Sequence, residues 1–240
     1  MLYLAARSSC LPLHIVGRGP CLNRTPMKDS KEYSKKIQKL YRSLKQKPGR
    51  RAHVEFDEPV DALVFAIVSE NLTESQVQAA MKKLKDYFVD WNDLRVATVE
   101  EIAEVLGQDM PAARNIAATL IGTLNAVFDK HNMLSLQSLR KLGKRPAKLL
   151  LEKLSGATPF VVDYCMLTAL QGHAIPLTPK MIEYLKTSQL IDAEAGYEEI
   201  EGFLARLISI KNAYEFYSLL RHESESPKAH TGKTKQAKKK

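Results

Sequence analysis

Residues 151–185 read LEKLSGATPFVVDYCMLTALQGHAIPLTPKMIEYL, and this is the most informative segment of the chain. Its apolar residues follow helical spacing on both sides of residues 155–158, which predicts two helices joined by a tight turn. Pro159 and Pro179 stand where proline favours the first turn of a helix. Backbone N–H groups at such a turn can hold a phosphate without a charged side chain. On geometry alone, an ordinary helical hairpin is the simpler explanation.

Outward from this hairpin, helical patterns extend in both directions. They begin near Ser30 and recur to about Arg221, and Pro59, Thr73 and Thr98 stand at predicted helix starts. No stretch shows a convincing alternation of β-branched and polar residues. We therefore predict an all-α body of roughly ten helices with short connections.

Charge is unevenly distributed along the 240 residues, whose formal net charge is +9. Residues 1–53 hold 13 Lys and Arg against two acids, and residues 227–240 hold six lysines and no acid. The remaining stretch, 54–226, holds 17 basic and 25 acidic residues, a balance of −8. Basic tails bind polyanions through counterion release, but they also serve as solubilising extensions. Charge alone favours neither alternative.

Several protein classes are excluded by composition. No apolar run approaches the ~20 residues that span a bilayer, so we expect no membrane protein. Three cysteines, Cys10, Cys21 and Cys165, make neither a disulfide framework nor a four-thiolate metal cage. Residues 1–27 lack the unbroken apolar core of a signal peptide, so we interpret them as disordered or as a wrongly assigned start. We expect a cytoplasmic protein.

A cluster of cations precedes the hairpin and is here called the 140–148 cluster. It places five positive charges within nine residues: Arg140, Lys141, Lys144, Arg145 and Lys148. A solvated helix face is the commoner meaning of such a run. Its position beside a turn suited to phosphate favours nucleic-acid binding instead.

Three segments in register carry a resemblance to a known family. LSGATPFVV at 154–162 overlays the pattern Leu-Pro-Gly-x-Gly-x-Lys-Thr-Ala, and AARNI at 112–116, after Gly107, overlays Lys-Ala-x-Asn-Ile. VSENLTE at 68–74 overlays Leu-Ser-x-Gln-x-x-Asp. Over about residues 59–222 the chain thus resembles the helix-hairpin-helix DNA glycosylases of the endonuclease III-like superfamily.

The resemblance implies an all-α, two-lobed fold with a helix-hairpin-helix motif. The glycosylase-like domain would cover residues 28–226, followed by a disordered basic tail at 227–240. One lobe would comprise 59–187, and the second would combine 28–58 with 188–226.

The resemblance also implies a mechanism, and the residues at its key positions do not supply it. Family members grip phosphates with the hairpin, flip out a damaged base and cleave its N-glycosidic bond. Bifunctional members attack the sugar with a hairpin lysine, but that position is Phe160, which has no lone pair. The assisting aspartate falls at Thr178, with Lys180 at the family's histidine, or at Leu177 one residue earlier. Neither supplies the carboxylate that stabilises the transition state.

The expected DNA contacts follow from the same alignment. They are the hairpin residues, the 140–148 cluster, and Asn71 at the family's intercalating glutamine, although Asn71 is equally typical of a turn. The hairpin residues are Gly156, Ala157 and Thr158. Thr158 replaces a glycine, which makes a positive φ costlier, and Pro159 lacks an N–H, so phosphate binding should be weaker than in the family.

No cofactor is expected, because many family members hold an iron–sulfur cluster with four C-terminal cysteines and this chain has none beyond Cys165. The expected partner is double-stranded DNA, bound by a monomer; as a DNA-binding protein it would associate with the nucleoid.

Three hypotheses remain open. The first is a DNA-binding protein of base excision repair ancestry that lacks glycosylase and lyase activity. The second is an active, monofunctional DNA glycosylase with a relocated acid, for which Asp163 and Glu183 are the first candidates. The third is a protein–protein interaction module on the same fold, favoured by the acidic body.

Overall fold

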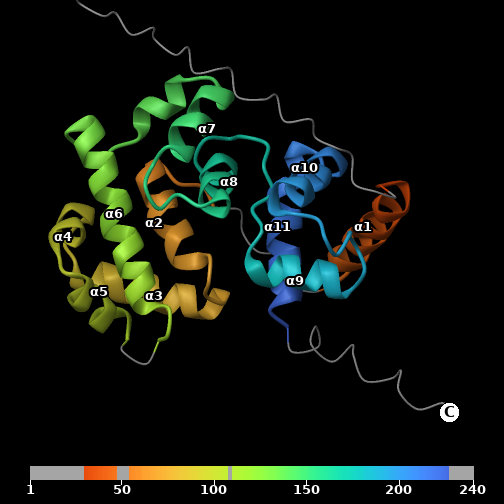
Figure 1. Ribbon diagram of the computed structural model, residues 1–240, viewed down its shortest axis with the longest axis horizontal. Coiled ribbons are helices and arrows are strands. Elements are labelled where there is room, and N and C mark those ends of the chain that lie inside the picture. The colour runs from red at the N-terminus through yellow and green to blue at the C-terminus, as the bar shows by residue number, and fades with distance from the viewer. Residues whose placement is uncertain (1–29, 48–53, 108–109, 227–240) are drawn as a thin grey trace, which may run out of the picture.

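A computed structural model describes residues 30–47, 54–107 and 110–226 (Figure 1). Within these ranges the chain is helical and contains no strand, which confirms the predicted fold class. The elements are α1 (Ser30–Lys45), α2 (Pro59–Ser69), α3 (Glu74–Tyr87), α4 (Trp91–Val96), α5 (Val99–Leu106), α6 (Ala113–His131), the 3-10 helix η1 (Gln137–Lys141), α7 (Lys144–Glu152), α8 (Pro159–Thr168), α9 (Pro179–Thr187), α10 (Tyr197–Leu207) and α11 (Ile210–Ser224). The predicted extension at 1–27 and the basic tail at 227–240 lie outside the described residues.

Helix starts follow the predicted signals. Pro59, Pro159 and Pro179 each occupy the first turn of a helix. Before α3, the backbone N–H of Thr73 donates to the side chain of Gln76 at 2.9 Å, as a capping box requires. At the starts of α8 and α9 the hydroxyls of Thr158 and Thr178 likewise accept a hydrogen bond from a free N–H group of the first turn.

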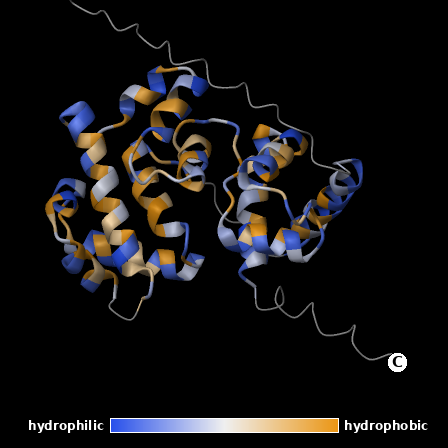
Figure 2. Cartoon of the chain, viewed as in Figure 1, coloured by the Kyte–Doolittle hydropathy of each residue, from blue (hydrophilic) through white to orange (hydrophobic). Residues whose placement is uncertain are grey.

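The core is built around α2 and α8, which pack against each other. Both helices are buried along nearly their whole length, and Figure 2 shows α2 as largely hydrophobic. A helix that is apolar on all sides must be enclosed by other elements. Helices α3 and α6 pack against α2, and helices α7 and α11 pack against α8.

The helices form two groups (Figure 1). One contains α2 to α8, and the other contains α1, α9, α10 and α11. Helix α11 packs against α1 and α9 and also reaches α8, which joins the groups. The lobe boundary predicted at residue 187 stays a prediction, and α9, which it assigns to the first lobe, packs against α11.

Candidate nucleic-acid interface

The turn between α7 and α8 is pressed against α6. Gly156 has φ +78°, and a Cβ at this position would lie 2.5 Å from Oγ1 of Thr123. The same hydroxyl donates to the carbonyl of Ser155 at 2.8 Å. Glycine is required here by both conformation and space.

Thr158 does not strain the turn, so the expected cost of a positive φ is wrong. Its backbone is extended, with φ −69° and ψ 163°, and its hydroxyl accepts a hydrogen bond from the N–H of Val161 at 3.3 Å. A threonine at this position caps α8, where extended backbone is the rule. Thr158 stands where the family has a glycine, but its backbone does not adopt the left-handed conformation for which glycine is suited.

Of the three predicted hairpin residues, Ala157 uses its N–H within the turn, donating to the carbonyl of Leu154 at 3.2 Å. The N–H groups of Gly156 and Thr158 form no hydrogen bond with any described residue. These two donors, next to the start of α8, are what the hairpin offers to a phosphate.

Phe160, at the family's lysine position, is a core residue. It is 1% exposed, and its ring lies 6.0 Å from that of Tyr164. Tyr164 in turn stacks on Phe65 of α2 at 5.5 Å and meets Tyr217 of α11 edge-on at 5.8 Å. Aromatic side chains therefore occupy the junction of α2, α8 and α11, and Phe160 supplies no nucleophile.

Thr178, at the family's aspartate position, is the N-cap of α9. It is buried, and its hydroxyl accepts from the N–H of Met181 at 3.3 Å. The neighbouring Lys180 is exposed. The position has a structural role that a threonine fulfils without ionising.

Asp163, the first candidate for a relocated acid, is enclosed by protein groups. Its Oδ1 lies 2.8 Å from Nζ of Lys148, and its Oδ2 accepts from the hydroxyl of Tyr197 at 3.0 Å. The Tyr197 oxygen accepts in turn from the N–H of Leu177 at 3.3 Å. Burial raises the pKa of Asp163, while Lys148 and Tyr197 oppose the rise. The network joins α7, α8 and α10 and holds the segment that leads to Thr178.

Glu183, the second candidate, is exposed on α9. An exposed carboxylate on this helix gives no support to Glu183 as a relocated catalytic acid.

The 140–148 cluster is only partly available to a ligand. Arg140 donates to the carbonyl of Phe56, Lys144 donates to the carbonyl of Leu170, and Lys148 pairs with Asp163. Lys141 and Arg145 are exposed and have no ion pair or hydrogen bond from their side chains to any described residue. The structure therefore separates this run into three cations that hold the fold and two that face outward.

Asn71 is exposed in the loop between α2 and α3, and a buried arginine fixes that loop. Nη2 of Arg221, on α11, donates to the carbonyls of Ser69 and Leu72, both at 2.9 Å. Its Nε lies 3.0 Å from Glu225. Sequence analysis missed Arg221 because some 150 residues separate it from the loop it holds.

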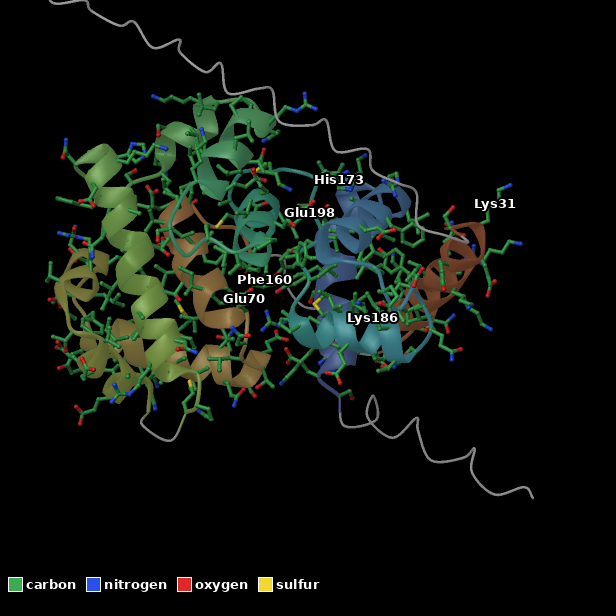
Figure 3. The ribbon with its side chains drawn as sticks, viewed as in Figure 1. Lys31, Glu70, Phe160, His173, Lys186 and Glu198 are labelled. Carbon is green, nitrogen blue, oxygen red and sulfur yellow. The ribbon has the colours of Figure 1, made fainter. Side chains whose placement is uncertain are left out.

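Glu70, also missed, brings a carboxyl group to the hairpin. It is partly buried at the end of α2, where its carboxyl group interacts with the side chain of Thr158. Burial raises the pKa of Glu70, and the interaction with Thr158 opposes the rise. Figure 3 labels Glu70 and Phe160 in the same part of the structure. No sequence pattern predicts this proximity, because Glu70 and Thr158 are far apart in the chain and Glu70 lies in the turn before a helix cap.

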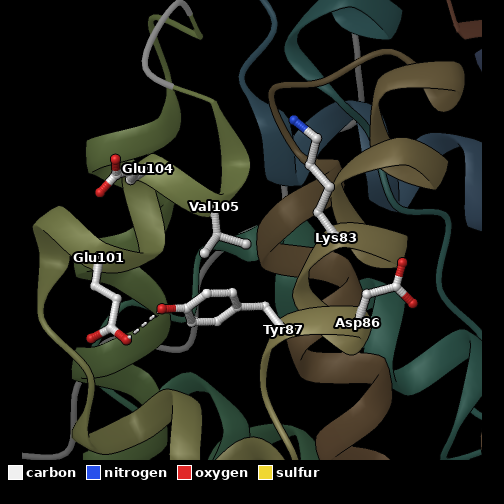
Figure 4. A pocket seen from close by; sticks show the side chains of 6 residues that line it. All are labelled: Lys83, Asp86, Tyr87, Glu101, Glu104 and Val105. Carbon is white, nitrogen blue, oxygen red and sulfur yellow. Dashed lines mark hydrogen bonds between the residues drawn. The ribbon is translucent and has the colours of Figure 1, made fainter.

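A pocket of about 450 Å³ lies between α3 and α5, away from these residues (Figure 4). It is lined by Lys83, Asp86, Tyr87, Glu101, Glu104 and Val105. Three carboxylates against one lysine repel phosphate. No lining residue belongs to the hairpin, so this pocket is not the predicted site.

The described residues contain neither a cluster of metal ligands nor a membrane-spanning helix. Among residues 30–47, 54–107 and 110–226, no His, Cys, Asp and Glu side chains gather as metal ligands. No helix in the same ranges is long and apolar enough to cross a bilayer. The expected absence of a cofactor stays a prediction.

Comparison with known proteins supports the resemblance. No family model matches the chain. An Arabidopsis thaliana protein, provisionally named a DNA glycosylase, is 26% identical over 166 residues, which are 69% of this chain and 56% of the relative. The chain thus spans little more than half of that relative's length.

Solved structures match over most of the chain. An endonuclease III trapped in a covalent intermediate with DNA superposes with a TM-score of 0.62 at 15% identity, covering 81% of this chain and 85% of that one. The 3-methyladenine DNA glycosylase of H. pylori gives 0.57 at 16% identity, covering 80% and 95%. The chain therefore has the helix-hairpin-helix fold of the endonuclease III-like DNA glycosylases.

Proposed function

We propose that this protein binds duplex DNA through the α7–α8 hairpin and performs no lysine-based lyase chemistry at that site. Support for binding comes from the two N–H groups of Gly156 and Thr158, from the exposed cations Lys141 and Arg145, and from the fold. The names of the solved relatives describe glycosylases and complexes with DNA.

The absence of the lysine and aspartate chemistry of the family is inferred from the residues at two positions, Phe160 and Thr178. Phe160 is a core residue, and Thr178 caps a helix. Both positions have been taken over by structural roles, so neither supplies a nucleophile or a carboxylate. We expect the protein to bind distorted or damaged duplex DNA as a monomer and to be located with the DNA of the cell. We expect it to release no base.

The test uses Ser155, an exposed turn residue at which a charged and a neutral side chain of the same shape can be compared. Ser155→Glu places a carboxylate beside the hairpin N–H groups, and Ser155→Gln is its neutral isostere. We expect Ser155→Glu to weaken duplex binding about tenfold because like charges oppose each other at the contact. Ser155→Gln should bind as wild type does. Equal binding by both variants would remove the hairpin from the interface, and no duplex binding by wild type would favour an interaction module.

A second candidate function is hydrolytic base excision, which one specific observation favours. Glu70 brings a partly buried carboxyl to the N-cap of α8, next to the loop of Asn71. A partly buried carboxyl beside the hairpin is suited to general acid or base catalysis of base release. Under this alternative, free base accumulates with damaged duplex and Glu70→Gln abolishes its release, whereas Glu183→Gln has no effect.

A further inference from the structure

The outer face of α1 carries a line of cations, here called the α1 stripe. It consists of Lys31, Lys35, Lys39 and Arg42, all of them exposed. At 3.6 residues per turn these four positions fall within roughly 80° of arc around the helix. The sequence places them on a single face, and Lys31 points away from the body at the edge of the molecule (Figure 3).

The opposite face of α1 fixes the direction of the stripe. Ile37 and Leu44 are fully buried there, and the ring of Tyr41 lies 5.3 Å from that of Phe216, edge to face. The Tyr41 hydroxyl also donates to Glu215 at 2.5 Å. Because these contacts attach α1 to α11, the stripe faces away from the protein.

Neighbouring cations are neutralised, but the stripe is not. Lys36 pairs with Glu32 at 2.7 Å, and Lys45 pairs with Glu215 at 2.8 Å. The four side chains of the stripe make no ion pair or hydrogen bond with any described residue. They form an uncompensated row of positive charge on a protein whose stretch 54–226 is acidic.

The length of the stripe suits a nucleic-acid backbone. From Lys31 to Arg42 the helix advances by eleven rises of about 1.5 Å each, which is about 16 Å. One DNA strand presents a phosphate about every 3.4 Å along the axis, so the stripe runs beside about five phosphates. Each of the four cations along that length can therefore approach a phosphate group.

A membrane surface fits less well. Basic amphipathic helices bind anionic bilayers by burying their apolar face among the lipids. Here that face is already packed against α11. The stripe therefore offers charge without an apolar anchor.

We propose that the α1 stripe is a second DNA-binding surface that contacts the phosphate backbone of duplex DNA. This proposal rests on the proposed function in one respect, which is that the ligand is duplex DNA. It adds a contact on the group of helices that does not contain the hairpin, and thereby extends the length of duplex that the protein covers.

The experiment measures how the dissociation constant for a 30-base-pair duplex depends on salt. The stripe variant combines Lys31→Gln, Lys35→Gln, Lys39→Gln and Arg42→Gln. Each lost phosphate contact lowers the slope of log affinity against log salt by about 0.9, so we expect a decrease of about two to four. Binding at fixed moderate salt should weaken at least about tenfold.

The matched control removes the same total charge from exposed lysines elsewhere. It combines Lys82→Gln, Lys85→Gln, Lys130→Gln and Lys211→Gln. Its slope should stay within about one of the wild-type slope. If the stripe variant and this control behave alike, the α1 stripe is only a solvated face and the proposal is wrong.

Two further arms separate this proposal from the hairpin function. A loss with Ser155→Glu and none with the stripe variant would keep the hairpin and overturn the stripe. The reverse result would keep the stripe and overturn the hairpin. Vesicles of equal parts phosphatidylserine and phosphatidylcholine should not bind; binding that the stripe variant abolishes would assign the stripe to membranes instead.

Discussion

The 140–148 cluster and the α1 stripe are both rich in lysine and arginine, but their cations have different surroundings. In the 140–148 cluster, Lys144 and Lys148 bond to a carbonyl and a carboxylate of the protein. In the α1 stripe, no side chain bonds to a described residue. A dense run of positive charge in a sequence therefore does not show where a polyanion binds. What matters is whether the fold has already provided partners for the charges.

The largest expected effect concerns Arg221, which is 4% exposed and has protein partners on every nitrogen of its guanidinium. Arg221→Met removes the donors that hold the Asn71 loop and leaves Glu225 without its cation. We expect a loss of about 3–5 kcal/mol of unfolding free energy, measured by urea denaturation. The exposed cation Lys211 on the same helix gives the control, since Lys211→Met should change stability by less than about 0.5 kcal/mol.

Lys148→Met tests whether a cation of the 140–148 cluster stabilises the fold. It leaves the carboxyl of Asp163 buried with Tyr197 as its remaining partner, and we expect a cost of about 2 kcal/mol near neutral pH. Burial already raises the pKa of Asp163, and loss of Lys148 raises it further. The cost should therefore be small in acid, where the carboxyl is protonated, and grow as the pH rises through the folded-state pKa. A pH-independent cost, or none, would contradict the role assigned to the pair; Lys141→Met is the control.

Arg145 and Lys144 are adjacent in sequence and differ in their partners. Arg145 faces solvent, whereas Lys144 donates to the carbonyl of Leu170. We expect Arg145→Gln to weaken duplex binding about fivefold and Lys144→Gln to weaken it less than about twofold, by fluorescence anisotropy at fixed salt. Equal losses would show that Lys144 leaves its carbonyl to meet the DNA.

The smallest expected effect belongs to the α1 stripe. Replacement of its four cations by glutamine should alter unfolding free energy by less than about 0.5 kcal/mol, because surface groups without partners contribute little to stability. Thermal or urea denaturation of the stripe variant gives the measurement. A loss above about 1 kcal/mol would mean that these side chains stabilise the fold.

Much of the fold could be predicted because its signals are local. Proline at first turns and the Thr73 capping box act within a few residues, and the structure contains both. The buried character of α2 follows from its own composition. Such features depend on neighbours in the chain, which a sequence shows directly.

The site could be predicted less well because its contacts are distant in sequence. Arg221 reaches Ser69 across 152 residues, and Glu70 meets Thr158 from another helix. The expected strain at Thr158 was wrong because the backbone is extended there. Partners and backbone angles of this kind are set by tertiary packing, which motif alignment does not supply.

We infer that the α7–α8 hairpin still binds DNA, while the positions for bond breaking hold Phe160 and Thr178. The most direct measurement follows binding and free-base release together on a panel of damaged and undamaged duplexes. We predict complexes that Ser155→Glu weakens, with no base released and no Schiff base trapped by borohydride. Base release that Glu70→Gln abolishes would contradict the claim and establish a hydrolytic glycosylase.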